Sequence, residues 1–420
     1  MNKSIINHLQ KNKLYFPVFI FIVSFFFASM ANAQSTCSWA KKAGGTDEDY
    51  YSDMVTDGLG NVYVLGNFYS QTITVGGTTL TNQPYNYYYG AEMFLVKYDS
   101  CGNFKWAKQA GGNDNTRGTD ITVDAAGNVY VSGYSSADTV FFGSLKIITD
   151  EYADAFVVKY NSNGDAQWVQ QGSGKKNEQG TAVTVDKLNN VYLTGTFSSD
   201  YIKFGNDSIA NRNSYDDIFI AKFDNNGNLN WLRSGTGSSD DYPYSISTDA
   251  IGNVYLGGTF SSPYIRFGND SLALNGYYDI FLAKFNSSGT EQWIRVAGDT
   301  DDDEATAITT DAQGNTYVTG FIGSGATVNF GNHSITNNNY SLATFIAKYD
   351  ASGTGLWAKK GQGNSYTTCV AKSINIDVNE DPYIVGYYNS DSLDFGAIKI
   401  LNNSITAGNG TGGVVYTIFL

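Results

Sequence analysis

Five acidic side chains stand within six residues, at Asp299 and between positions 301 and 304. Asp299, Asp301 and Asp303 have the D-x-D-x-D spacing that opens a calcium-binding loop. The glycine that normally follows is missing, and Thr310 stands where such a loop has a bidentate glutamate. Calcium is therefore the one cofactor that the sequence suggests, and a solvated acidic loop is the alternative.

Tyrosines beside carboxylates form a second group that could bind a ligand. Aromatic faces of this kind suit stacking on a sugar ring, and the alternative is a set of simple surface aromatics. Paired acids such as Asp240 and Asp241 could also do the acid–base work of a glycosidase or lyase. The candidate ligand-binding residues are Tyr50, Tyr51, Tyr87, Tyr88, Asp240, Asp241 and Tyr242.

Several other kinds of chemistry are excluded by composition. The 420 residues contain two histidines, His8 and His333, which are too few for a three-histidine zinc site. His333 aligns with Asp207 and Asp270 at a turn position, which argues against a serine–histidine triad. The formal net charge of −14 argues against nucleic acid as a partner, because phosphate binding needs a basic face. No catalytic residue is assigned, and a non-catalytic protein is favoured over an enzyme.

The elements that must position these side chains repeat along the chain. Six tryptophans recur at intervals of 67, 62, 63, 62 and 64 residues, and a fixed period of this length indicates a repeat architecture. In one unit, an alternating apolar run ends at Asp124, turns at Gly127, and resumes with Val129. Runs of Val, Ile, Tyr and Phe divided by Gly/Asn turns are typical of β-hairpins. The tryptophans are Trp39, Trp106, Trp168, Trp231, Trp293 and Trp357.

Four strands in each of six units predict an all-β fold, a six-bladed β-propeller in residues 34–420. Residues 37–42 form a single Trp strand, and residues 414–420 match a third strand with no Trp strand after it. We expect the N-terminal strand to complete the last blade and close the ring, which removes exposed sheet edges. An open stack of sheets is the alternative. Tight turns follow strands one and three on one face, and longer connections follow strands two and four on the other.

The repeated motifs resemble the SBBP-type β-propeller repeats of exported bacterial proteins. The resemblance covers residues 37–420 and lies in Ala-Gly-Gly, Asp-x-x-Gly-Asn-Val-Tyr-Val-x-Gly, Phe-Gly-Asn-Asp-Ser and Asp-x-Phe-x-Ala-Lys-Phe-Asp. The sixth copy departs most, with residues 377–382 in place of the glycine turn, so its first hairpin is less certain than the fold. The resemblance implies a secreted or surface propeller and no established activity.

Three kinds of residue recur at equivalent positions, and each has a structural interpretation. We interpret the aspartates as turn formers, because Asp at the start of a tight turn hydrogen-bonds to its own backbone. The tryptophans are predicted to pack between blades. The lysines are predicted to pair with a carboxylate of a neighbouring blade, with an inward-facing ring as the alternative. The positions are Asp57, Asp124, Asp186, Asp249, Asp311 and Asp377, and Lys97, Lys159, Lys222, Lys284 and Lys348.

The first 33 residues have the pattern of a cleaved signal peptide. Lys3, Lys11 and Lys13 precede an apolar run at 14–28, and Ala31-Asn-Ala33 ends the segment. An uncleaved membrane anchor is the alternative, but the run is shorter than the roughly 20 residues that span a bilayer. Three cysteines, Cys37, Cys101 and Cys369, allow one disulfide in an oxidising compartment.

These observations predict a secreted or cell-surface protein, with the periplasm as a further possible compartment. We expect a monomer without a transmembrane segment after cleavage. Its variable loops would bind an unknown protein or glycan, because loops on a rigid scaffold are where binding sites concentrate. The alternatives are a carbohydrate-binding propeller and a carboxylate-based glycosidase or lyase.

Overall fold

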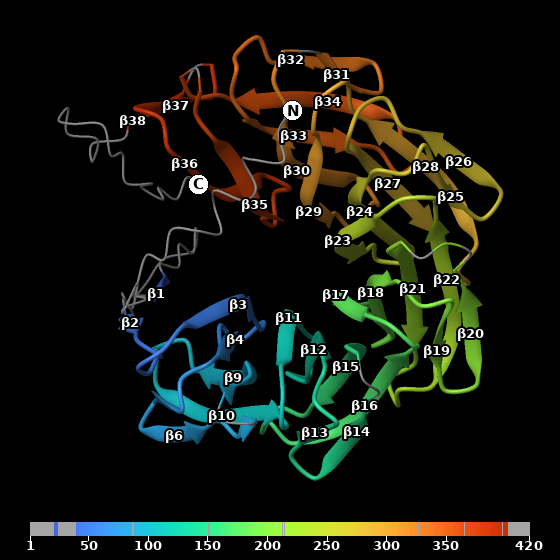
Figure 1. The fold of residues 1–420 in the computed structure, drawn as a ribbon. Helices are drawn as coiled ribbons and strands as arrows, with labels where there is room; N and C mark the ends of the chain where they lie inside the picture. Colours follow the sequence, from blue (N-terminus) through green and yellow to red (C-terminus); the bar gives the residue numbers. More distant parts are fainter. Residues whose placement is uncertain are drawn as a thin grey trace.

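The structure is a computed structural model that describes residues 21–23, 39–85, 88–149, 152–211, 213, 215–325, 327–364, 366–396 and 398–401. In this part of the chain every regular element is a β-strand. The repeats are arranged around a common centre, in chain order, with the first strand of each repeat nearest to that centre (Figure 1). No helix in the described residues is long and apolar enough to cross a lipid bilayer.

Five repeats each build a four-stranded antiparallel sheet, in which sequential strands pair from the centre outwards. The strands are β3 (Asp49–Thr56), β4 (Val62–Phe68), β9 (Glu92–Tyr98) and β10 (Phe104–Gly111); β11 (Thr116–Val123), β12 (Val129–Ser135), β15 (Asp154–Tyr160) and β16 (Ala166–Ser173); β17 (Glu178–Val185), β18 (Val191–Phe197), β21 (Asp217–Phe223) and β22 (Leu229–Thr236); β23 (Asp241–Thr248), β24 (Val254–Phe260), β27 (Asp279–Phe285) and β28 (Glu291–Ala297); β29 (Glu304–Thr310), β30 (Thr316–Ile322), β33 (Ala343–Tyr349) and β34 (Gly355–Gly361).

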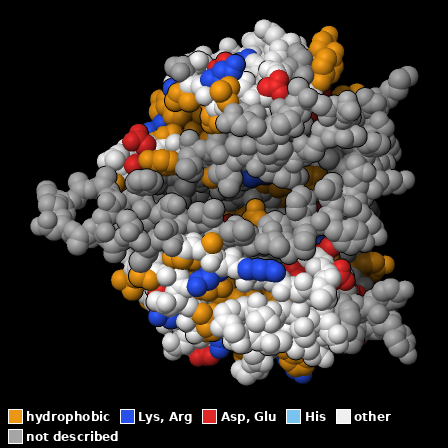
Figure 2. Space-filling model, turned by 90° about the vertical axis from the view of Figure 1, so that its left-hand side faces the viewer, with side chains coloured by type: hydrophobic (Ala, Val, Ile, Leu, Met, Phe, Trp, Pro, Cys, Tyr) orange, Lys and Arg blue, Asp and Glu red, His pale blue; other side chains and the backbone are white. Residues whose placement is uncertain are grey.

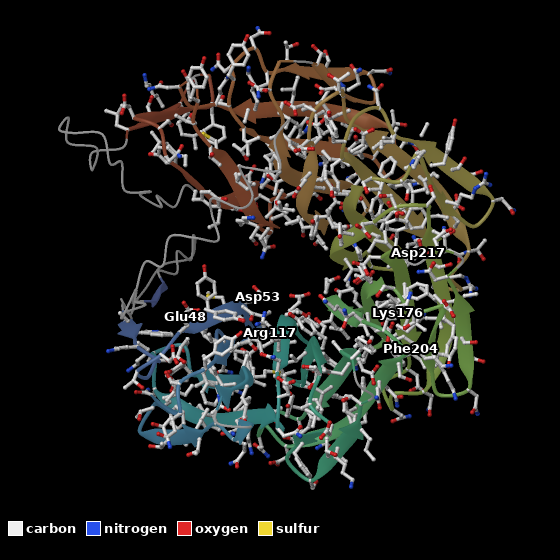
Figure 3. All side chains as sticks on the ribbon, viewed as in Figure 1. Glu48, Asp53, Arg117, Lys176, Phe204 and Asp217 are labelled. Atoms are coloured by element: carbon white, nitrogen blue, oxygen red, sulfur yellow. The ribbon has the colours of Figure 1, made fainter. Side chains whose placement is uncertain are left out.

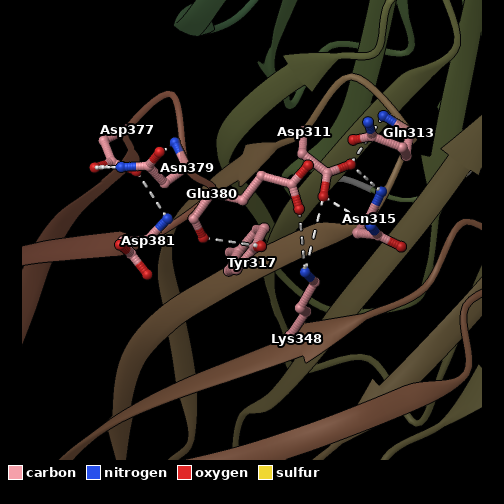
Figure 4. Close-up of polar contacts among 9 residues, drawn as sticks. All are labelled: Asp311, Gln313, Asn315, Tyr317, Lys348, Asp377, Asn379, Glu380 and Asp381. Atoms are coloured by element: carbon pink, nitrogen blue, oxygen red, sulfur yellow. Dashed lines mark hydrogen bonds and ion pairs between the residues drawn. The ribbon is translucent and has the colours of Figure 1, made fainter.

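The sixth repeat begins in the same way, with β35 (Cys369–Ile376) paired to β36 (Pro382–Tyr388). The hairpin forms because Glu380 adopts a φ of 66° at the position where four repeats have glycine and the third has Asn189. Glu380 also joins the fifth repeat, since its backbone oxygen accepts a 3.2 Å hydrogen bond from Tyr317 Oη and its carboxylate lies 3.8 Å from Lys348 Nζ (Figure 4). Residues 402–420 lie outside the described residues.

Each connection between the second and third strands contains a hairpin, which the prediction of four strands per repeat missed. The motif Phe-Gly-Asn-Asp forms the turn of this hairpin, with Phe204 opposite Asp207. Three of these hairpins pair with the outer strand of the preceding repeat, as Phe142 does with Ala110, and so extend that sheet to six strands. The hairpins are β5 (Thr72–Val75) and β6 (Thr78–Thr81), β13 (Thr139–Phe142) and β14 (Leu145–Ile148), β19 (Tyr201–Phe204) and β20 (Asp207–Ala210), β25 (Tyr264–Phe267) and β26 (Asp270–Ala273), β31 (Thr327–Phe330) and β32 (His333–Thr336), and β37 (Ser392–Asp394) and β38 (Lys399–Leu401).

The hydrophobic core lies between successive sheets. One buried cluster joins Tyr63 and Leu65 of the first repeat to Ile121 and Val131 of the second. Burying apolar area contributes about 25 cal/mol per Å². Because each cluster takes side chains from two repeats, neighbouring repeats stabilise one another.

The turn aspartates have the predicted structural role. Asp124 accepts hydrogen bonds of 2.9 Å from the backbone nitrogens of Ala126 and Asn128, and Tyr130 Oη donates to it at 3.0 Å. The bonds from the turn backbone recur in the other repeats, with Asp311 and Asp377 shown in Figure 4. The equivalent tyrosine also donates to the aspartate, except in the fifth repeat, where Tyr317 donates to the backbone oxygen of Glu380. The tyrosine that follows each turn is therefore part of the motif.

The tryptophans pack between repeats, as predicted. Trp106 Nε1 donates a 3.1 Å hydrogen bond to the backbone oxygen of Ser162 in the next repeat. Its ring lies against Gly164, whose φ is 79° and where an added Cβ would lie 3.0 Å from the ring. Trp168, Trp231 and Trp293 repeat this arrangement.

The prediction for the lysines is wrong in four of five repeats. Lys97, Lys159, Lys222 and Lys284 donate to a backbone oxygen of the next repeat rather than to a carboxylate. Lys348 alone has carboxylate partners, Asp311 at 3.9 Å and Glu380 at 3.8 Å. A turn carbonyl is available in every repeat, whereas a glutamate at the position of Glu380 is not.

The N-terminal strand β2 (Trp39–Lys41) pairs antiparallel with β1 (Phe21–Val23), which belongs to the predicted signal peptide. Its expected partner, residues 414–420, lies outside the described residues, so closure of the ring stays a prediction. Cys101 and Cys369 are not bonded to each other, and Cys37 lies outside the described residues. Figure 2 views the side on which β1, β2 and β38 lie, where hydrophobic, basic and acidic side chains are interspersed.

Candidate functional site

The innermost strands carry a β-bulge in every repeat, which turns one extra residue out of each ladder. In β11 the bulge lies between Gly118 and Asp120, and the hydroxyl of Thr119 donates a 2.8 Å hydrogen bond to the backbone oxygen of Gly180 in β17. Thr181 and Thr306 form the same link to the next repeat. These bonds fix the distance between the inner strands of neighbouring repeats. The inner strands therefore form a rigid scaffold around the common centre.

Seven residues before each turn aspartate, the inner strand presents a side chain that differs from repeat to repeat. These positions lie at the beginning of the strand, on the face that carries the long connections. We call this set the inner rim, and it consists of Tyr50, Arg117, Gln179, Tyr242, Glu304 and Val370, of which Val370 is buried and the other five are partly exposed. Variation at an equivalent position on a repeated scaffold points to recognition rather than to folding.

One part of the inner rim is an arginine among tyrosines. Arg117 donates from Nη1 to Tyr134 Oη at 3.4 Å and from Nη2 to Tyr69 Oη, and its Cζ lies 5.7 Å from the Tyr69 ring centre. Tyr50 packs beside Tyr69, with ring centres 6.3 Å apart, and burial raises the pKa of Tyr50 to about 12. Figure 3 places Arg117 at the central edge of the first two repeats.

A second part of the inner rim is aromatic and acidic. The rings of Tyr242 and Tyr244 are stacked at 6.4 Å with planes 20° apart. Burial first, and then the nearby Asp240, raise the pKa of both Tyr242 and Tyr278. These phenols therefore stay protonated at neutral pH and can donate hydrogen bonds.

A buried carboxyl pair lies on the inner strands of the first two repeats. Asp53 and Asp120 hold equivalent positions in β3 and β11 and share a hydrogen bond. Burial, followed by the charge of Asp53, raises the pKa of Asp120 well above its ordinary value, so one carboxyl stays protonated and donates a hydrogen bond to the other. The second oxygen of Asp120 accepts a 2.7 Å bond from the backbone nitrogen of Val183. The pair therefore links three inner strands.

The predicted ligand-binding residues are only partly brought together. Tyr50 and Tyr242 both stand on the inner rim, at equivalent places in the first and fourth repeats, and Tyr51 is 51% exposed beside Tyr50. Asp240 lies beside Tyr242, whereas Asp241 is fully buried and accepts hydrogen bonds from Ser261 and Ser262. Tyr87 lies outside the described residues; Tyr88 lies in the short strand β8 (Tyr88–Tyr89), which pairs with β7 (Pro84–Tyr85).

The proposed calcium loop is held by its own hydrogen bonds. Asp303 is buried and accepts from the backbone nitrogens of Asp299 and Gly323, and Asp301 accepts two bonds of 2.9 Å from Ser324. Within the described ranges, no group of three or more His, Cys, Asp or Glu side chains is arranged to hold a metal ion. Calcium binding by Asp299, Asp301 and Asp303 stays a prediction.

Buried carboxyls also recur between the repeats. Burial raises the pKa of Asp217, Asp241 and Asp303 to about 7 and that of Glu178 to about 8. One oxygen of Asp217 has no hydrogen-bond partner, whereas the equivalent Asp154 accepts a 2.5 Å bond from Gln171. Glu178 and Asp241 accept hydrogen bonds within their own repeats, and these buried groups are not accessible to a substrate.

Arg117 of the inner rim was not among the residues predicted from the sequence, and neither were its neighbours Tyr69, Tyr134, Tyr244 and Tyr278. Arg117 lies 48 residues after Tyr69 in sequence, and no motif joins the two. A comparison of equivalent positions across the repeats would have found Arg117, because it is the one basic residue at its position.

The comparisons with known proteins agree with the repeat architecture. Residues 105–140 match the family described as the SBBP β-propeller repeat, which confirms the resemblance seen in the sequence. An uncharacterized WD repeat-containing protein, L264, of Acanthamoeba polyphaga mimivirus is 24% identical over 84% of this chain, and the regulatory protein FlaEY of Caulobacter vibrioides is 28% identical over 35% of it. The chain spans 31% and 15% of the lengths of these two relatives.

Among solved structures, the WD40 domain of Pan2 from Neurospora crassa is similar over 82% of this chain and 86% of that chain. The TM-score is 0.39 and the sequence identity is 8%.

Proposed function

We propose that this chain, which carries the SBBP-type β-propeller repeat, is a secreted or surface-exposed, non-catalytic binding module. It would hold its partner on the face formed by the long connections. The observation that carries this proposal is a row of exposed tyrosines that recurs just before the third strand of successive repeats. We call it the tyrosine band, and it consists of Tyr152, Tyr215, Tyr277 and Tyr340, which are 47%, 51%, 72% and 71% exposed.

The tyrosine band supports binding because a large aromatic side chain left in water loses the benefit of burial. One such tyrosine is unremarkable, but an exposed tyrosine two residues before the third strand in three consecutive repeats, and three residues before it in the next, is a property of the surface. The band also continues towards the sixth repeat, where Tyr340 stacks on Tyr366 with ring centres 5.8 Å apart and planes 10° apart. A partner that covers these rings would bury apolar area without distorting the scaffold.

The placement of the acids supports a non-catalytic role. General acid–base catalysis needs a carboxyl with a raised pKa within reach of the substrate. The carboxyls whose pKa is raised most, such as those of Glu178, Asp217 and Asp241, are instead buried between repeats.

We further propose that six blades close into a ring, with the strand around Trp39 as the outer strand of the last blade. Trp39 Nε1 donates a 3.2 Å hydrogen bond to the backbone oxygen of Ser100, and its ring lies against Gly102. Trp106 has the same two contacts with the second repeat. Trp39 therefore contacts the first blade in the same way as the tryptophan of an outer strand contacts the blade that follows it.

Export would follow cleavage after Ala33, which would remove β1 and release β2 for pairing with residues 414–420. The mature protein would begin at Gln34 and act as a monomer. N-terminal sequencing of the exported protein tests this step, and an intact Met1 would favour a membrane anchor instead.

The binding proposal is tested with a glycan array and with purified cell-envelope fractions, each with and without calcium. The test variant is Tyr277→Ala/Tyr340→Ala in the tyrosine band. The matched control is Tyr201→Ala/Tyr264→Ala, which removes two tyrosines of 39% and 60% exposure from the outer hairpins. We expect the band variant to lose binding and the control to keep it. Equal binding by both variants, or release of hydrolysis products, would overturn the proposal.

A further inference from the structure

Arg117 is a half-buried cation without an anionic partner. Four ion pairs are formed among the described residues, and none includes Arg117. The groups that act on its charge are the phenols of Tyr50, Tyr69 and Tyr134, and its Nε is buried with no hydrogen-bond partner. Arg233 and Arg295 also meet no carboxylate, but they donate to backbone oxygens of the next repeat, whereas the hydrogen bonds of Arg117 go to phenol hydroxyls.

The surroundings keep the guanidinium in place without neutralising it. Tyr69 and Tyr134 accept its hydrogen bonds through neutral hydroxyls, and the Tyr69 ring faces its Cζ at 5.7 Å. Arg117 belongs to the inner strand β11, whose neighbour Thr119 is tied to the next repeat at 2.8 Å. The planar group is thus oriented in advance, which lowers the entropy lost when a ligand binds.

The guanidinium group matches a carboxylate better than it matches any neutral group. Two parallel N–H donors can bind both carboxylate oxygens, and such charge-assisted pairs are shorter and stronger than neutral hydrogen bonds. Each of the two Nη groups of Arg117 donates one hydrogen bond to a phenol and keeps a second N–H with which to donate to a ligand, whereas Nε is buried. A carboxylate bound here would replace the anionic partner that the chain itself does not supply.

We propose that Arg117, with Tyr50, Tyr69 and Tyr134, binds the carboxylate of a hexuronic acid residue in an acidic polysaccharide. This inference rests on the proposed function and names its ligand class. Sugar rings stack on aromatic faces, and the tyrosine band lies on the same long-connection face, where it would contact further residues of the polymer. The carboxylate of a peptide C-terminus could also bind Arg117, but such a peptide would not account for the tyrosine band.

The test compares a galacturonate hexamer with its methyl ester by isothermal titration calorimetry. The ester keeps the rings and removes the negative charge. We expect the acid to bind and the ester to bind at least about tenfold more weakly. Arg117→Lys, which keeps the charge but not the two-pronged geometry, should weaken acid binding, and Arg117→Met should abolish the preference for the acid. Arg233→Met is the matched control, because that arginine binds the backbone oxygens of Gly289 and Leu232 on an outer strand.

The melting temperature of each variant is measured first, and Arg117→Lys serves as the reference if Arg117→Met unfolds. Equal affinity for the acid and the ester, or unchanged binding by folded Arg117→Lys and Arg117→Met, would overturn the inference. If a neutral glycan binds and is lost in Tyr277→Ala/Tyr340→Ala, the proposed function holds and the acidic ligand does not. Binding of a free tetrapeptide carboxylate with no binding of the hexamer would assign the site to peptide ends and would also overturn it.

Discussion

Lys284 donates a 2.8 Å hydrogen bond from Nζ to the backbone oxygen of Ala351, which stands 67 residues later in the next repeat. The same Nζ lies 4.9 Å from the centre of the Tyr255 ring in its own repeat. One side chain therefore joins two strands of its own sheet and the tight turn of its neighbour. This link explains why lysine recurs in a strand that is otherwise buried and apolar.

Replacing Lys284 by methionine keeps most of the stem and removes both polar contacts. We expect Lys284→Met to lower the free energy of unfolding by about 1–3 kcal/mol, since a hydrogen bond from a charged donor and a cation–π contact are lost. Urea denaturation measures this change. Lys187→Met, at an exposed turn, is the control, and an equal effect of both substitutions would contradict the role of the link.

The turn aspartates differ in whether they accept a hydrogen bond from a buried side chain as well as from the turn backbone. Asp124 bonds to the turn backbone and to the buried Tyr130 hydroxyl, whereas Asp224 bonds only to an exposed turn. Asp124→Ala should cost about 3 kcal/mol and Asp224→Ala about 1 kcal/mol, because only Asp124→Ala removes the nearer acceptor of a buried hydroxyl and leaves Tyr130 Oη with Asn225 Oδ1 at 3.4 Å. Thermal melts of the two variants check this order, and the reverse order would rule out the explanation.

Stability should fall as the pH rises from about 4 to about 8. Burial raises the pKa of Asp217 to about 7 and that of Glu178 to about 8 in the folded protein. In this range the folded state binds more protons than the unfolded state, so deprotonation favours unfolding. The stabilisation is complete below the ordinary carboxyl pKa of about 4 and is lost as the pH passes the raised values.

The pH prediction is checked by urea melts between pH 5 and pH 8. Asp217→Asn should flatten the dependence and raise stability above pH 7, because the amide carries no charge at any of these pH values. Asp200→Asn, at an exposed connection, should leave the dependence unchanged. A protein that is more stable at pH 8 than at pH 5 would contradict the assignment.

Ring closure makes a prediction for Trp39 in the mature chain. If the strand around Trp39 completes the last blade, Trp39→Ala and Trp106→Ala should each cost about 3–5 kcal/mol, as large-to-small changes at packed aromatics do. An unpaired terminal strand would fray, and Trp39→Ala would then have little effect. Differential scanning calorimetry of both variants distinguishes the two cases.

Much of the local structure could be predicted from the sequence because its causes lie within one repeat. Asp124 forms its turn with residues at most six positions away, and glycine supplies the positive φ that the turn needs. The sequence motif alone therefore predicts the hairpin. The periodic tryptophans likewise predicted contact between repeats. The hairpins in the second connections were missed because their strands are only four residues long.

What only the tertiary structure decided is which side chains of different repeats meet. Arg117 reaches Tyr69 across 48 residues, Lys284 finds a carbonyl where a carboxylate was expected, and Asp241 is buried although its neighbour Asp240 is partly exposed. The spacing of the repeats determines that neighbouring sheets pack together. The direction of each side chain depends on the β-bulges, on the twist between neighbouring sheets and on the distance between those sheets. All three are determined by the packing of the repeats against one another, which the sequence of a single repeat does not specify.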